Sequence, residues 1–279
     1  MMKPNRLKQV LAQGGIPVGH MLLEFGTRGI AKILEAARLD FAIVDMEHTG
    51  FTSADVADII AWFKATSVAP FVRIPQIQYH FIARTLDAGA LGVMVPNVRS
   101  AAQARAIVDA ARYTPLGNRG LTIGVAHTDF QSPDPREFMD DSNENTTVIC
   151  QIESREGLDN LEDIASTPGV DVLWVGHGDL AKSLDVPGQL HHPRLLDALG
   201  LVVDTARTHG LGAGIQPGSL AQAREWMELG FNVISYGGDV RVYLKALTEA
   251  VAGVRKLAED GSGSAYQSVG DPQNSTLPQ

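Results

Sequence analysis

Short runs of β-branched and other apolar residues alternate along the chain with longer stretches of helical periodicity. Turn residues bound the apolar runs, as is typical of buried strands in a parallel sheet. The candidate strands lie at 16–23, 41–46, 70–74, 91–95, 147–152, 170–176, 211–215 and 231–236. The helical patterns that follow them lie near 28–38, 53–66, 79–88, 100–112, 157–166, 194–208, 219–229 and 239–259. Eight alternating units predict an α/β protein, a (β/α)8 barrel.

Two segments fall outside this alternation. The connection at 113–146 is too long for an ordinary link between a helix and a strand, and we interpret it as a lid, an oligomer contact or a tolerated surface loop. From Gly261 onward the chain is rich in Ser, Gly, Pro and Gln. We therefore expect a barrel domain over 1–260 and a flexible tail over 261–279.

Composition narrows the class of protein. The chain has 279 residues, 44% of them hydrophobic, and a single cysteine, Cys150, which cannot form an intrachain disulfide. The start of the chain does not resemble a signal peptide and no apolar run is long enough to span a bilayer, so we expect a soluble, cytoplasmic protein. The excess of 32 acidic over 23 basic residues argues against binding to nucleic acid or to an anionic membrane.

Polar residues gather at the carboxyl ends of the predicted strands, where (β/α)8 enzymes carry their chemistry. They are Asp45, Glu47 and His48 after the second strand, Arg73 at the end of the third, Gln151 and Glu153 after the fifth, Asp179 after the sixth and Gln216 after the seventh. Unpaired buried charges are costly, so this grouping on one rim points to a functional site.

Glu153 and Asp179 are carboxylates on adjacent units, and hard oxygen ligands favour Mg²⁺ or Mn²⁺. The alternative is that each carboxylate caps the helix that follows it. Gly176 and Gly178 flank His177 just before Asp179. They would let the backbone approach a ligand, and their N–H groups could hold a carboxylate.

His48 and Arg73 are the candidates for acid–base and electrostatic work. His48 suits a general acid or base, and Arg73 carries a permanent charge that could stabilise an oxyanion. A lone histidine is more often a satisfied polar residue, and Arg73 could instead form a buried ion pair with Asp45 or Glu47. Asp45 joins the candidate catalytic residues on this ground.

Six segments together resemble the HpcH/HpaI aldolase family of the pyruvate/phosphoenolpyruvate barrel superfamily. They are DMEH, FVRIP, VMVPNV, RYTPLGNRG, QIES and VGHGDLAKSL, in the right order between about residues 19 and 258. The resemblance implies a class II aldolase that forms or cleaves 4-hydroxy-2-oxo acids from a 2-oxo acid and an aldehyde through a pyruvate enolate. It also implies a homo-oligomer, a hexamer or trimer, with the eighth helix exchanged between subunits.

The resemblance assigns roles to individual residues. Glu153 and Asp179 would bind the metal, Mg²⁺ or Mn²⁺, with Co²⁺ as a further candidate, and Asp179 would also lie at the substrate. His48 would be the base and Arg73 the transition-state stabiliser. Gln151 and the backbone of Gly178 would contact the substrate. Asp87 would increase the basicity of a histidine equivalent to His48, and its place near the opposite rim assigns that histidine to another subunit.

The sequence departs from the family pattern at His177, where relatives carry proline, and at His20 and Met21, where they often carry tryptophan. These changes leave the identity of the acceptor aldehyde open. Two other hypotheses remain open. One is an oxaloacetate decarboxylase or decarboxylating C–C ligase similar to the macrophomate synthase branch. The other is a non-catalytic module that binds 2-oxo acids, which would require the loss of the metal or the base.

Overall fold

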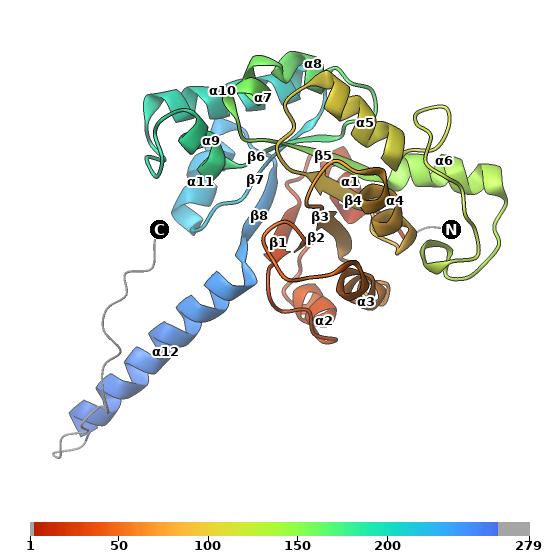
Figure 1. The fold of residues 1–279 in the computed structure, drawn as a ribbon. Helices are drawn as coiled ribbons and strands as arrows, with labels where there is room; N and C mark the ends of the chain where they lie inside the picture. The colour runs from red at the N-terminus through yellow and green to blue at the C-terminus, as the bar shows by residue number, and fades with distance from the viewer. Residues whose placement is uncertain (1–2, 262–279) are drawn as a thin grey trace.

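The chain folds into a closed barrel of eight parallel strands surrounded by helices (Figure 1). The computed structural model describes residues 3–261. The strands are β1 (Val18–Leu22), β2 (Phe41–Asp45), β3 (Ala69–Arg73), β4 (Gly92–Val95), β5 (Thr147–Ile152), β6 (Val172–Val175), β7 (Gly212–Ile215) and β8 (Val233–Gly238). Each strand pairs with the next along the chain, and β8 returns to β1. The predicted (β/α)8 barrel is confirmed.

Helices alternate with the strands along the chain, and most of them cover the outside of the barrel. They are α1 (Arg6–Ala12), α2 (Ile30–Ala36), α3 (Ser53–Phe63), α4 (Tyr79–Asp87), α5 (Ala101–Ala111), α6 (Pro135–Asn145), α7 (Arg155–Asp159), α8 (Leu161–Ala165), α9 (His177–Ser183), α10 (Pro193–Thr208), α11 (Leu220–Leu229) and α12 (Asp239–Gly261), with the 3-10 turn η1 (Ala126–Thr128). None of these helices, all within residues 3–261, is long and apolar enough to cross a lipid bilayer.

Alternate residues of each strand fill the barrel interior, because successive side chains point to opposite faces. The interior strand residues are Met21, Phe41, Ile43, Ala69, Phe71, Met94, Ile149, Val172, Trp174 and Val233, and Leu7 of α1 and Leu91 before β4 pack with them. Trp174 needs Gly214 beside it, since a Cβ on Gly214 would overlap the indole ring. The other apolar set, including Val44 and Val72, packs outward under the helices. The mouth of the barrel is left to polar side chains.

Three helices were not predicted, α1, α6 and α9, and one predicted helix was wrong. The long connection at 113–146 contains η1 and α6, whose strongly polar sequence PREFMDDSNEN has few apolar residues and buries only Phe138 and Ser142. The predicted helix at 157–166 is two short helices, α7 and α8, that meet at Asn160, whose backbone is not helical. The tail was predicted over 261–279, and residues 262–279 lie outside the part of the chain that the structure describes.

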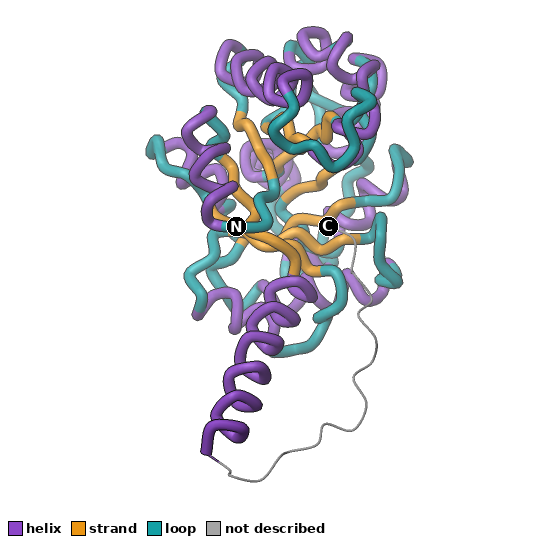
Figure 2. Tube along the Cα trace, turned by 90° about the vertical axis from the view of Figure 1, so that its left-hand side faces the viewer, coloured by secondary structure: helices purple, strands orange, loops and turns teal. Residues whose placement is uncertain are grey.

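The helix α12 leaves the barrel and extends away from it (Figures 1 and 2). Its first residue, Asp239, is only 4% exposed and holds the loop after β1. The Asp239 carboxylate accepts hydrogen bonds from the backbone N–H groups of Leu23 (3.0 Å), Glu24 (2.9 Å) and Phe25 (2.8 Å). The ring of Phe25 in turn meets Tyr243 edge-on at 5.4 Å. The start of α12 is therefore fixed to the rim of the barrel.

We expect Asp239→Ala to lower the free energy of unfolding by about 2–4 kcal/mol, because three backbone N–H groups would lose a buried, charged acceptor. Urea denaturation at one fixed protein concentration measures the change. Asp58→Ala, on the exposed surface of α3, removes the same charge and is the control. Equal effects of the two substitutions would contradict this role of Asp239.

Candidate active site

A buried ion pair joins the ends of β2 and β3. Asp45 and Arg73 face each other in the strand register. Arg73 Nε donates to Asp45 Oδ1 and Arg73 Nη2 to Asp45 Oδ2, both at 2.7 Å. Asp45 is 0% exposed and Arg73 is 9% exposed, so this two-pronged pair is shielded from water. The predicted pairing of Arg73 with Asp45 is present, with a third nitrogen, Nη1, left for other partners.

Asp45 also shapes the turn that follows β2. Its carboxylate accepts hydrogen bonds from the backbone N–H of Glu47 (2.9 Å) and, more weakly, of His48 (3.4 Å). The hydroxyl of Thr49 donates to the backbone carbonyl of Asp45. One carboxylate thus fixes both the arginine and the backbone that carries Glu47 and His48.

Glu47 and His48 occupy this turn at the mouth of the barrel. Glu47 Oε2 lies 3.2 Å from Arg73 Nη1 and 3.7 Å from His48 Nε2. Burial raises the pKa of Glu47, and the charges of Arg73 and His48 oppose that rise. The His48 side chain is 62% exposed, so its ring can reach a ligand in the mouth.

Glu153 is the most perturbed carboxyl group of the mouth. Its Oε1 accepts the backbone N–H of Asn97 at 2.7 Å, and its Oε2 accepts the side-chain amide of Gln151. Burial raises the pKa of Glu153 to about 7, and the negative charges of Glu47 and Asp179 add to the rise. A buried carboxylate near two others is stabilised by a cation.

Asp179 lies in the first turn of α9, with its side chain 59% exposed and 3.8 Å from Lys182 Nζ. Within residues 3–261 no group of three or more His, Cys, Asp or Glu side chains is arranged as a metal site. Mg²⁺ and Mn²⁺ often use two protein carboxylates and complete their coordination with water and substrate. The pair of Glu153 and Asp179 fits such an ion, because each Glu153 oxygen keeps a second lone pair for it.

Gly176 and Gly178 differ in what they allow. A Cβ on Gly176 would overlap Glu153 Oε2 and lie 2.8 Å from Gln151 Nε2, whereas a Cβ on Gly178 would meet nothing within 4 Å. Gly176 therefore makes room for Glu153. The ring of His177 packs against Trp226 of α11, with 5.0 Å between centroids. His177 is thus engaged in packing between α9 and α11.

Asp87 lies apart from these residues, at the end of α4 just before β4 begins. Its Oδ1 accepts Arg119 Nη2 at 2.5 Å and lies 3.7 Å from His127 Nδ1. Lys64, at the end of α3, pairs with Asp129 and not with Asp87. Arg119 and His127 come from the irregular 113–146 segment, so sequence periodicity carried no signal of them.

Comparison with known proteins decides the family. A family model described as HpcH/HpaI aldolase/citrate lyase matches residues 23–246. The chain belongs to this family. The resemblance found in the six sequence segments is thereby confirmed.

Several relatives cover nearly the whole length of the chain. A hydroxypyruvate/pyruvate aldolase from Paraburkholderia phytofirmans is 34% identical over 257 residues, which cover 90% of this chain and 98% of that protein. A 5-keto-4-deoxy-D-glucarate aldolase from Klebsiella pneumoniae is 32% identical over 253 residues, covering 91% and 98%. A solved HpcH/HpaI aldolase from Desulfitobacterium hafniense is 31% identical with a TM-score of 0.86, covering 92% and 98%.

Membership of the HpcH/HpaI family gives the carboxyl rim of this barrel a chemistry, that of carbon–carbon bond lyases. The structure brings Asp45, His48, Arg73, Gln151 and Glu153 to that rim, with Gly178 and Asp179 beside them at the start of α9. It keeps Asp87 away from His48 of the same chain. Sequence reasoning missed Asn97, because a backbone N–H from the turn after β4 has no signature in residue type. The side-chain amide of Gln216, the polar residue predicted after the seventh strand, donates a hydrogen bond to the backbone carbonyl of Gly237 at 2.8 Å.

We expect Gly176→Ala to weaken the binding of Mn²⁺ by about tenfold or more, because the added methyl group would displace Glu153, the candidate ligand, from its contact with Gln151. Isothermal titration calorimetry with Mn²⁺ measures the affinity, and circular dichroism checks the fold. Gly178→Ala adds the same methyl group two residues away, in open space, and should keep the affinity for Mn²⁺. A Gly176→Ala protein with unchanged affinity would show that Glu153 does not need this space.

Proposed function

We propose that this protein is a divalent-metal-dependent aldolase that forms and cleaves 4-hydroxy-2-oxo acids through a pyruvate enolate. The observation that carries the proposal is the set of carboxylates, Glu47, Glu153 and Asp179, around one arginine and one exposed histidine at the carboxyl rim. The aldolase names of relatives that match along 87–91% of the chain support the same reaction class.

Each residue then has a task in aldol cleavage. Arg73 would donate from Nη1 or Nη2 to the oxygen on which negative charge develops. His48 would take the proton of the C4 hydroxyl as the C3–C4 bond breaks, releasing an aldehyde. The bonding electrons pass to C3 and C2 as the enolate, and protonation at C3 gives pyruvate. A divalent cation at Glu153 and Asp179 would orient the 2-oxo acid and stabilise the enolate charge.

Gln151 and Gly178 would complete the binding of the 2-oxo acid. Gln151 is 4% exposed, and its amide oxygen is buried with no hydrogen-bond partner among the described residues. A buried polar atom of this kind is normally satisfied by water or a ligand. The exposed backbone of Gly178, at the start of α9, stands where the carboxylate of the 2-oxo acid would meet N–H groups.

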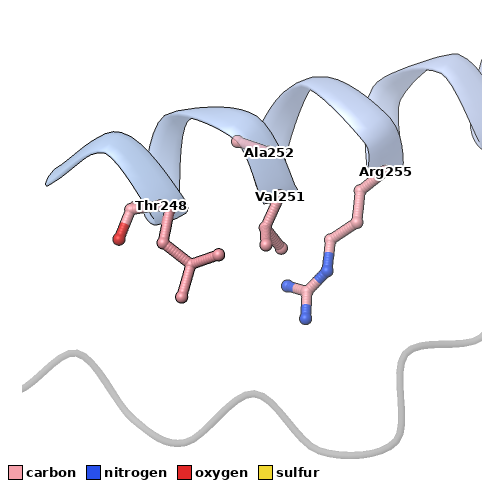
Figure 3. Close-up of a pocket in the computed structure, with 5 residues that line it drawn as sticks. Thr248, Val251, Ala252 and Arg255 are labelled. Atoms are coloured by element: carbon pink, nitrogen blue, oxygen red, sulfur yellow. The ribbon is translucent and has the colours of Figure 1, made fainter. Parts of the chain in front are cut away.

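We propose that the active form is a homo-oligomer in which α12 packs on a neighbouring barrel. Apolar residues follow one another along α12 at alternating intervals of four and three, the spacing of a helix-packing seam. They are Val240, Leu244, Leu247, Val251 and Val254, each at least 39% exposed. Leu247 and Val251 also border a recess on α12 with Thr248, Ala252 and Arg255 (Figure 3).

Activity should require a divalent cation, and cation binding should weaken below pH 7. Because burial raises the pKa of Glu153 to about 7, a proton competes with the cation below that pH, so we expect affinity to fall about tenfold per pH unit there and to level off above it. Calorimetry with Mn²⁺ from pH 5.5 to 8 measures this. Glu153→Gln should remove the dependence and Glu156→Gln, on exposed α7, should keep it.

Chelation with EDTA should also abolish aldol cleavage, and Mg²⁺ or Mn²⁺ should restore it. Full turnover after exhaustive chelation would contradict the class II assignment, as would a lysine adduct trapped by borohydride.

The role of His48 separates aldol cleavage from oxaloacetate decarboxylation, the second candidate reaction. We expect His48→Ala to slow aldol cleavage by about 10²-fold or more and decarboxylation much less, because only cleavage takes a proton from a hydroxyl. Arg73→Lys should slow both reactions by about 10²–10³-fold, because an ammonium group cannot replace the two-pronged guanidinium. The lysine still gives the buried Asp45 a positively charged partner. His209→Ala, at the end of α10, is the control. Equal losses in both reactions on His48→Ala would argue against a base role.

The proposed pairing of Asp87 with His48 of another subunit predicts complementation. Inactive His48→Ala and Asp87→Ala proteins, mixed after dissociation and reassembly, should regain activity because some sites would hold both intact residues. Reassembly of each variant alone is the control. Exchange shown by native mass spectrometry without recovered activity would rule out a shared site.

A further inference from the structure

Glu47 contacts both the arginine and the histidine of the candidate site. Its Oε2 lies 3.2 Å from Arg73 Nη1 and 3.7 Å from His48 Nε2, although neither contact is aligned as a hydrogen bond. Asp45 fixes the other side of the arginine and the backbone N–H of Glu47. The Glu47 carboxylate thus lies between the guanidinium of Arg73 and the ring of His48, on a turn that cannot shift without disturbing Asp45.

The charges around Glu47 make this position costly. Arg73 from β3 and His48 from the same turn attract the carboxylate, while Asp45 from β2, Asp179 from α9 and Glu153 from β5 repel it. Arg73 already compensates the charge of Asp45. Glu47 is a second carboxylate beside that arginine, and its buried Oε2 has no aligned hydrogen-bond donor among the described residues. A neutral side chain at this position would give a more stable protein.

We propose that Glu47 is a positioning residue for aldol chemistry, holding His48 at a fixed place relative to Arg73. This inference rests on the proposed function. When His48 takes the proton of the C4 hydroxyl, the imidazolium faces the Glu47 carboxylate and its new charge is compensated. Oxaloacetate decarboxylation removes no hydroxyl proton, so Glu47 would affect it only through its contact with Arg73.

A double-mutant cycle tests this role. We expect Glu47→Gln to lower kcat for aldol cleavage by about 10–100-fold, with KM and oxaloacetate decarboxylation changed less than about threefold. In a His48→Ala background the same substitution should cost less than about twofold, because the two residues act as a unit. Glu228→Gln, on the exposed surface of α11, removes the same charge and should leave both reactions unchanged. Equal losses in the two backgrounds would overturn the proposal.

Two further measurements distinguish the positioning role of Glu47 from other roles. Mn²⁺ affinity, by calorimetry, should be unchanged in Glu47→Gln, and a loss of tenfold or more would make Glu47 a metal ligand instead. The ¹⁵N signals of the His48 ring, assigned by comparison with His48→Ala, should shift in Glu47→Gln and not in Glu228→Gln. Unchanged signals would overturn the positioning role. If the wild type catalyses neither reaction, the proposed function fails, and these ring signals still decide the place of Glu47.

Discussion

The ion pair between Asp45 and Arg73 is the constraint on which the mouth of the barrel depends. It joins neighbouring strands in register and excludes water, so removing either partner would leave a buried charge at a cost of about 3–5 kcal/mol. Because the same carboxylate holds the backbone of Glu47 and His48, the pair fixes three functional groups. An arginine held in this way can stabilise an oxyanion without reorganising during the reaction.

The mouth has more negative than positive charge, and this imbalance explains its chemistry. Arg73 compensates Asp45, which leaves Glu47, Glu153 and Asp179 with His48 and the exposed Lys182. Burial raises the pKa values of Glu47 and Glu153, and the neighbouring carboxylates add to the rise. A divalent cation would relieve it at Glu153 and Asp179. Glu47, closer to the arginine and histidine, is then the carboxylate left to serve the proton transfer.

The sequence predicts this site as far as strand periodicity reaches. The alternation of side chains and the common direction of the strands bring Asp45, Arg73 and Glu153 to one rim, as predicted. The contacts that tune them come from turns, where no period exists. Asn97, at a φ of 59°, turns its N–H toward Glu153, and Arg119 reaches Asp87 from 32 residues away. Helix α6 was not predicted because it is a strongly polar surface helix with few apolar residues to mark its buried face.

Two features of the chain are consistent with the proposed assembly with other copies. Asp87 lies near the opposite rim from His48, held there by Arg119, and α12 carries its apolar seam away from its own barrel. In the proposed assembly both find partners at once. Asp239 connects the packing of α12 to the active site, because this first residue of α12 also binds the loop after β1 at the carboxyl rim. Burial of α12 against a neighbour would therefore order that rim, and association would stabilise the fold and the site together.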